Sequence, residues 1–187
     1  LEGAQYDLID VQYHLPEDCY GDTFYSDLGG HLEVLMWNIS RVYPGLWKLG
    51  NYPKDTEYTN FTATEKNCLA ALQEHCTNYG VEFEITSDGK TNTLNIKAKA
   101  GITHTFTLKY GRGRGLYQLS RTNVNNAGIT NRLFIYGGTE NLGKNYGHTK
   151  LCLPGTTRLT SYLEDAESIA AYGIKENEKN YTNIKPG

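Results

Sequence analysis

Residues 25–39 read YSDLGGHLEVLMWNI, and residues 61–85 read FTATEKNCLAALQEHCTNYGVEFEI. The apolar residues that follow Asp27 recur at the spacing of one helix face: Leu28, Leu32, Leu35, Met36, Ile39 and Val42. Ser26 or Asp27 can accept the free N–H groups of a first helical turn, and Pro44 ends the pattern. The first stretch therefore predicts a helix.

The second stretch predicts another helix over residues 64–79, stopped by Gly80. Its apolar stripe comprises Cys68, Leu69, Leu72, Cys76 and Tyr79. Val81, Phe83 and Ile85 then alternate with glutamates, which indicates a strand. A turn at residues 87–90 and the returning residues 94–98 complete a predicted hairpin.

Segments in which apolar and polar residues alternate, as is typical of strands, lie on both sides of this region. Residues 5–14 alternate apolar and polar side chains, which predicts an N-terminal strand. Residues 105–110, 116–122 and 132–136 predict further strands, and we expect open strand edges near 106–110 and 133–136. The switch from helical to strand period favours an α+β fold. A small helix-plus-hairpin α/β subdomain would span residues 23–103 and join a mostly antiparallel β subdomain at 104–187, to which residues 1–22 contribute a strand.

Composition excludes several functional classes. The 187 residues carry a net charge of −3, so the protein has no overall positive field that would attract nucleic acid. No apolar run approaches the roughly 20 residues of a membrane span. The four cysteines are Cys19, Cys68, Cys76 and Cys152. Their spacing does not indicate a disulfide framework. We expect all four to be reduced, mostly buried thiols, which suits assembly in a reducing cytoplasm.

No residue pattern predicts a catalytic, cofactor-binding or metal site. Cys68, His75 and Cys76 do not offer the four ligands in tetrahedral reach that zinc needs, and neither do His148 and Cys152. Paired glutamates (Glu82 with Glu84, Glu164 with Glu167) are far more often a solvated face than an acid/base pair. Nucleophile and metalloprotease motifs are missing from the sequence.

The sequence GRGRG at residues 111–115 lacks the spacing and the helix of a dinucleotide loop. It is either a solvated basic hairpin loop or a contact in which Arg112 and Arg114 bind an acidic neighbouring subunit. The 15 tyrosines can fill strand faces, anchor subunit interfaces or form platforms for sugars. Together with the expected strand edges, this makes Arg112, Arg114, Tyr110 and Tyr136 candidate subunit-interface residues.

Three stretches resemble the bacteriophage tail hub (baseplate hub, tail-associated) family. The pair quoted at the start is similar to its module of helix, strand, helix and hairpin. Residues 105–138, TFTLKYGRGRGLYQLSRTNVNNAGITNRLFIYGG, resemble its returning strands. Residues 161–187, SYLEDAESIAAYGIKENEKNYTNIKPG, resemble the segment that leads into its next module.

The resemblance implies an internal fragment of a larger virion protein, with a barrel-like β subdomain of the tail-tube type. It further implies a non-enzymatic role in the phage or prophage tail, where a trimeric hub joins tail tube to tail tip. The implied partners are other copies of the protein and the neighbouring tube and tip proteins. A carbohydrate-binding or adhesion module for a bacterial surface is the alternative, and a hydrolase fragment is a weaker third.

Overall fold

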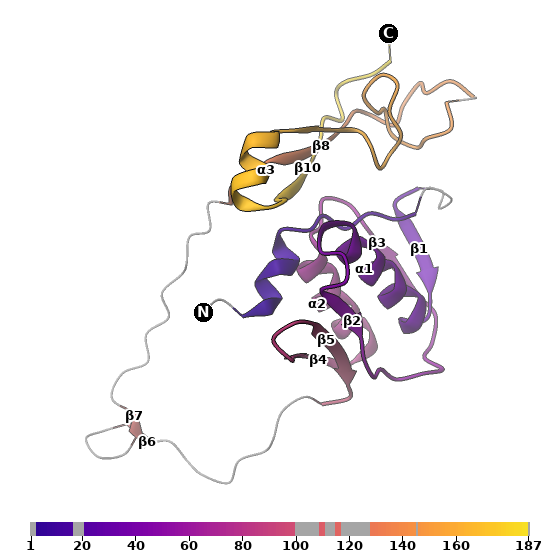
Figure 1. Cartoon of the computed structure of the whole chain (residues 1–187). Helices are drawn as coiled ribbons and strands as arrows, with labels where there is room; N and C mark the ends of the chain where they lie inside the picture. Colours follow the sequence, from indigo (N-terminus) through magenta and orange to yellow (C-terminus); the bar gives the residue numbers. More distant parts are fainter. Residues whose placement is uncertain are drawn as a thin grey trace.

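The computed structural model describes residues 3–16, 21–99, 109–110, 115–116, 128–144 and 146–186. Most of these residues form two compact units (Figure 1). The larger unit comprises residues 3–16 and 21–99, and the smaller unit comprises residues 128–144 and 146–186. The predicted α+β class is confirmed, with small sheets and no closed barrel among the described strands. Three strands in one sheet are too few to close on themselves.

Two helices form the centre of the larger unit. Helix α1 spans Leu28–Val42, and the Asp27 carboxylate accepts a 2.9 Å hydrogen bond from Gly30 N, as the capping pattern predicts. Helix α2 spans Cys68–Tyr79 and ends at Gly80, whose φ of 61° suits a residue without Cβ. The predicted start of α2 at residue 64 is wrong, because the Asn67 side chain caps Ala70 N and begins the helix there.

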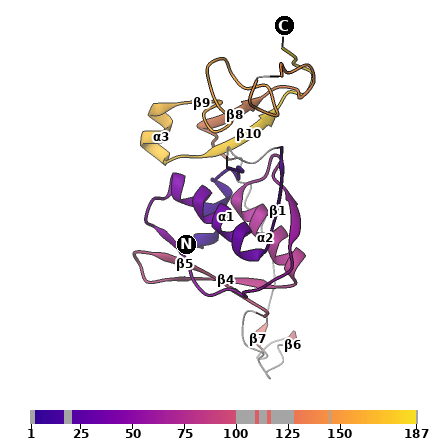
Figure 2. The ribbon, with the colours of Figure 1, turned by 90° about the vertical axis from the view of Figure 1, so that its right-hand side faces the viewer.

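Short strands flank the helices, as Figures 1 and 2 show. The predicted hairpin is confirmed as β4 (Glu82–Ser87) and β5 (Asn92–Lys97), and β2 (Trp47–Leu49) adds to β5 in parallel. On the other side, β1 (Thr23–Ser26) pairs with β3 (Thr59–Thr62). The apolar faces of these elements meet in one buried core around Leu32, Leu35, Phe61, Leu72 and Leu94.

The N-terminal segment corrects the predicted strand at residues 5–14. Ala4–Ile9 form a 3-10 helix (η1), and an extended chain follows, with one bridge from Gln12 to Asn67. Two polar members of the alternating pattern, Gln12 and His14, are buried rather than solvated. The Asn38 side chain accepts from His14 N (3.0 Å) and donates to His14 O (2.8 Å), in place of a partner strand. This segment packs into the core of the larger unit.

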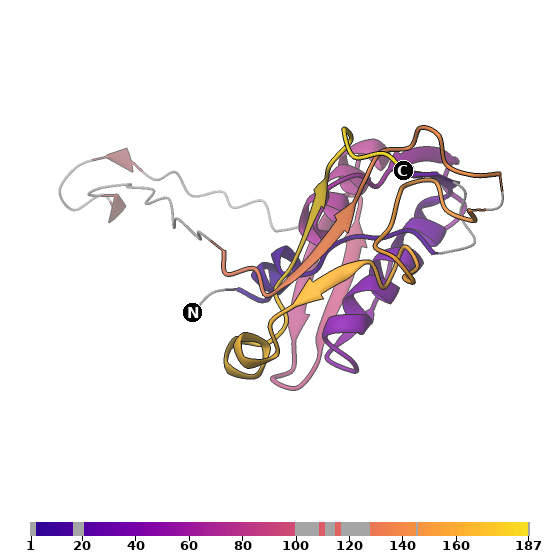
Figure 3. The same ribbon diagram turned by 90° about the horizontal axis from the view of Figure 1, so that it is seen from above.

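The smaller unit is a three-stranded sheet with one short helix. Strand β8 (Arg132–Tyr136) lies between β10 (Glu176–Asn180), which is parallel to it, and β9 (Tyr162–Glu164), which is antiparallel (Figure 3). Helix α3 (Ala166–Tyr172) connects β9 to β10. The predicted open edge at residues 133–136 is wrong, because β8 is paired on both sides.

Strands β6 (Lys109–Tyr110) and β7 (Gly115–Leu116) form a two-residue parallel pair. The rest of the strands expected at residues 105–110 and 116–122 lies outside the described residues.

Candidate functional site

The two units meet at a charged junction, which we define as Gln12, Asp22, Arg41, Arg132, Lys150, Arg158, Glu176 and Glu178. Glu176 is its centre, with a side chain that is 0% exposed. Its carboxylate accepts from Arg41 Nη2 (3.0 Å), Arg132 Nη1 (3.3 Å) and Gln12 N (3.1 Å). A carboxylate held by two guanidinium groups and an amide is anchored on several sides. Glu176 thus connects α1, the N-terminal segment and β8.

Glu178 is the second buried carboxylate of the junction, two residues further along the same face of β10. It accepts from Gln12 Nε2 (3.3 Å) and Asn180 Nδ2 (2.8 Å), and Lys150 Nζ lies 3.7 Å away. Burial raises the pKa of this carboxyl above its ordinary value, against the opposing effect of these hydrogen bonds and the Lys150 charge. Its contacts also span both units.

Asp22 completes the junction from the larger unit. One carboxylate oxygen accepts from Arg158 Nη2 (3.0 Å), and the other lies 2.9 Å from Lys150 Nζ. Arg158 also donates to Gly21 O at 2.8 Å. Asp10 forms a further ion pair across the units with Lys175. The junction is therefore an alternating network of charges rather than one ion pair.

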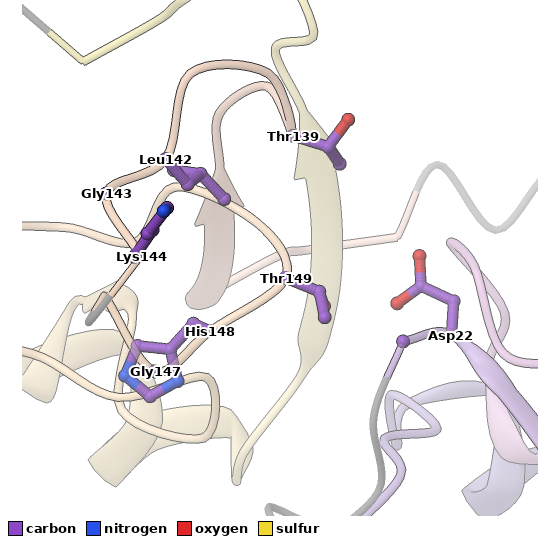
Figure 4. Close-up of a pocket in the computed structure, with 9 residues that line it drawn as sticks. Asp22, Thr139, Leu142, Gly143, Lys144, Gly147, His148 and Thr149 are labelled. Atoms are coloured by element: carbon purple, nitrogen blue, oxygen red, sulfur yellow. The ribbon is translucent and has the colours of Figure 1, made fainter.

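A cavity of about 760 Å³ opens beside Asp22 (Figure 4). Gly21 and Asp22 form one wall, and the remaining lining comes from the smaller unit: Thr139, Leu142, Gly143, Lys144, Gly147, His148 and Thr149. The Asp22 carboxylate is already bound by Arg158 and Lys150. The structure records no hydrogen bond between Asp22 and His148 within its described part. The described lining residues thus include no hydrogen-bonded acid/base pair.

Two of the histidines of the larger unit, His31 and His75, belong to a buried aromatic cluster. His31 and His75 stack with ring centroids 4.7 Å apart, and Phe61 lies 4.3 Å from His75. Burial, together with the charges of His31 and Lys66, lowers the pKa of His75 to about 3. Neither ring nitrogen of His75 has a hydrogen-bond partner among the described residues. These neutral rings pack as core side chains.

The prediction that the cysteines are mostly buried is confirmed for the three that the structure describes: Cys68, Cys76 and Cys152. Burial raises the pKa of the Cys68 thiol well above its ordinary value and that of Cys76 to about 11. A thiol so far from its thiolate form is a poor nucleophile. No group of three or more potential metal ligands is found in the described ranges, and Cys19 lies outside them.

The predicted interface residues have three different outcomes. Arg112 and Arg114 lie outside the described residues. Tyr110 lies in β6, and the structure describes only its backbone. The prediction for Tyr136 is wrong: its side chain is 2% exposed, and its hydroxyl donates to Arg158 O at 2.6 Å. The ring belongs to the core of the smaller unit and cannot contact a partner.

Sequence reasoning missed the junction itself. The available signal was the alternation of Glu176 and Glu178 with Asn177 and Lys179 in β10. Acidic side chains two residues apart normally indicate a solvated strand face. The burial of Glu176 depends on Arg41, 135 positions away in the chain, and that of Glu178 on Gln12, 166 positions away, which no local pattern reveals.

The described residues include no helix with both the length and the apolar character that crossing a bilayer requires. Comparison with protein-family models finds no match, and comparison with curated proteins finds none either.

Proposed function

We propose that this chain is a structural segment of a phage or prophage tail hub, where it helps to join tail tube to tail tip. The observation that supports this most is the order of elements in the larger unit. Helix α1, short strands, helix α2 and the β4–β5 hairpin follow one another as the resemblance implies. The proposed place of the protein is therefore the virion, after assembly in the bacterial cytoplasm.

The charged junction supports a structural role, in which the two units keep one relative orientation. Glu176, Glu178 and Asp22 each have cationic partners, and several of these ion pairs cross between the units. Buried, multiply bonded charges favour one relative orientation, because any other leaves a charge uncompensated. A segment of a ring must hold a fixed angle between its parts.

Strand β9 offers a surface for a neighbouring copy. It is an edge strand of the β10–β8–β9 sheet, and its Leu163 side chain is 61% exposed. Exposed strand edges associate unless charge or proline blocks them. We infer that copies meet head to tail around a threefold axis, with β9 at the contact.

Light scattering on the full-length protein that contains this sequence tests the proposal. A trimer is expected, and Leu163→Lys should weaken it while Tyr172→Lys, at an equally exposed position on α3, should not. A stable monomer of the full-length protein would contradict the hub role.

The alternative function, an adhesion module with a concave aromatic site, has less support. Trp47 is buried at 8% exposure, and the described residues that line the cavity in Figure 4 include no Trp, Tyr or Phe. For the hydrolase alternative, we expect no turnover of peptidoglycan, peptides or glycans. If the protein did hydrolyse one of these substrates, and a single substitution abolished that activity, the hydrolase alternative would be supported instead.

A further inference from the structure

The outward face of the β1–β3 ladder has an unusual composition. Register places Tyr25 opposite Asn60 and Thr23 opposite Thr62, and Tyr58 continues the same alternation one step before β3. All five side chains are exposed. We call them the outer ladder face. The opposite face carries Phe24 and Phe61, which pack into the core of the larger unit.

This face is uncharged although 21% of the chain is charged. Each of its five side chains carries a hydroxyl or an amide that can form hydrogen bonds. The structure records no hydrogen bond from these side chains to any residue that it describes. The outer ladder face therefore presents donors and acceptors to a ligand without a net charge.

Two of its tyrosines form an open aromatic pair. The rings of Tyr25 and Tyr58 have centroids 5.5 Å apart and planes tilted by 44°. Their side chains are 63% and 60% exposed, so each ring still has area to offer. Aromatic rings with a polar tip suit ligands that are apolar on one side and hydroxylated on the other.

The strands beneath the pair are held in place. The Tyr79 hydroxyl accepts from Thr59 Oγ1 at 2.9 Å and donates to Ser26 O at 3.0 Å. Thr59 and Ser26 are paired residues next to Asn60 and Tyr25. This link fixes the ladder end on which the two rings stand, so a ligand would find them already positioned.

We propose that the outer ladder face binds a neutral saccharide. The C–H face of a pyranose ring would stack on Tyr25 and Tyr58, and its hydroxyls would bond to Asn60 and the two threonines. A single-stranded nucleic acid also stacks on aromatic rings but requires a cationic groove for its phosphates, and none of the five residues is cationic.

Size argues against a protein partner at this face. Four residues at roughly 3.3 Å each give a ladder about 13 Å long, with strands about 5 Å apart. A stable protein interface takes about 800 Å² from each partner, several times the area of such a patch. Two or three sugar rings match its length. A saccharide contact here is independent of the tail-hub role, because β9 and the junction take no part in it.

NMR titration of the whole chain tests the proposal, with maltotriose, cellotriose and tri-N-acetylchitotriose as neutral probes at millimolar concentrations. At least one probe should shift the amide signals of residues 23–26 and 58–62 in a saturable manner. The double variant Tyr25→Ala/Tyr58→Ala should weaken that binding about tenfold or more, since stacking contacts are lost. Asn60→Ala should weaken it less.

The matched control is Tyr172→Ala, which removes an equally exposed tyrosine from α3 and should leave the affinity unchanged. Thermal unfolding of each variant verifies that the fold persists, as expected for exposed positions. Absence of saturable shifts with all three probes would overturn the proposal. So would unchanged affinity in the folded double variant, or a double variant that changes the oligomeric state and thereby reveals a protein interface.

Discussion

The larger and smaller units are stabilised by different kinds of buried side chain. Leu32, Leu35 and Leu72 typify the larger core, where apolar side chains from helices and strands meet. In the smaller unit, the buried apolar cluster of the described residues is Phe134, Tyr136 and Cys152. Asn131, Ser161, Glu176 and Glu178 are buried there as well. The smaller unit thus depends on polar bonds, several of which end on the larger unit.

This difference predicts which substitutions destabilise each unit. Apolar burial is not directional, so the larger core should lose stability in proportion to the volume removed. A buried charge requires particular partners, so the smaller unit should fail when one donor or acceptor is lost. Four measurements test this difference between the two units.

The largest effect is expected for Phe61→Ala in the larger core. Phe61 is 1% exposed and lies 5.1 Å from the Tyr13 ring and 4.3 Å from the His75 ring. Loss of a buried phenyl ring should lower the free energy of unfolding by about 3–5 kcal/mol in urea denaturation. Tyr25→Ala, on the outward face of the paired strand, is the control and should cost far less. Equal losses would contradict the placement of this core.

Glu176→Ala tests the junction. It leaves Arg41 and Arg132 without their shared carboxylate, but their side chains are 20% and 17% exposed and regain some water. We expect a loss of about 2–4 kcal/mol, below the full cost of isolated buried charges. Hydrogen exchange should accelerate in β8 and β10 while α1 and α2 stay protected.

The control for this variant is Glu140→Ala, which removes a surface ion pair with Lys185 whose side chains are 70% and 49% exposed. Such pairs contribute about 0–1 kcal/mol, so stability should change little. Uniform acceleration of exchange in both units of Glu176→Ala would mean that the units unfold together.

Acid should weaken the larger unit through His75. Its folded pKa is about 3 against an ordinary 6.5, so below pH 6.5 the unfolded chain binds a proton that the folded chain does not. Stability should therefore fall as pH drops, by about 1.4 kcal/mol per pH unit for this group, or about 2 kcal/mol between pH 6.5 and 5. Urea denaturation across this range should show the slope.

His75→Leu should reduce that slope. A residual slope is expected from His14 and His31, whose pKa values burial also lowers. Glu178 acts in the opposite sense: its raised pKa means that its stabilisation is greatest below its ordinary pKa and is lost as pH rises. A slope unchanged in His75→Leu would show that this ring does not control acid sensitivity.

The smallest effect is expected for Asn131→Ala in the smaller unit. Its side chain donates to Gly173 O (2.8 Å) and accepts from Lys175 N (2.7 Å), which holds the chain between α3 and β10. Leaving those backbone groups unsatisfied should cost about 1–2 kcal/mol in thermal or urea unfolding. Asn177→Ala, at an exposed position of β10, should cost less. The reverse order would contradict the assigned role of Asn131.

Local patterns predicted the centre of the larger unit well. The Asp27 cap, the Gly80 stop and the β4–β5 hairpin are decided by residues within a few positions of one another. The N-terminal segment shows where such patterns fail. Its alternation of apolar and polar residues indicates a strand, yet its backbone bonds go to separate elements: those of Val11 and Tyr13 to residues 66–68, and those of His14 to the Asn38 side chain of α1.

Sequence patterns alone were enough to predict the α+β class, both long helices, the hairpin and the burial of the described cysteines, because each rests on short-range spacing or on composition. Only the tertiary structure decided that Glu176 and Glu178 are buried, that Tyr136 is inside rather than at an interface, and that Tyr25 and Tyr58 stand together on one face. The physical reason is that burial of a charge or pairing of distant rings depends on partners brought close by folding. Arg41 meets Glu176 across 135 positions of sequence, and that contact has no local signature.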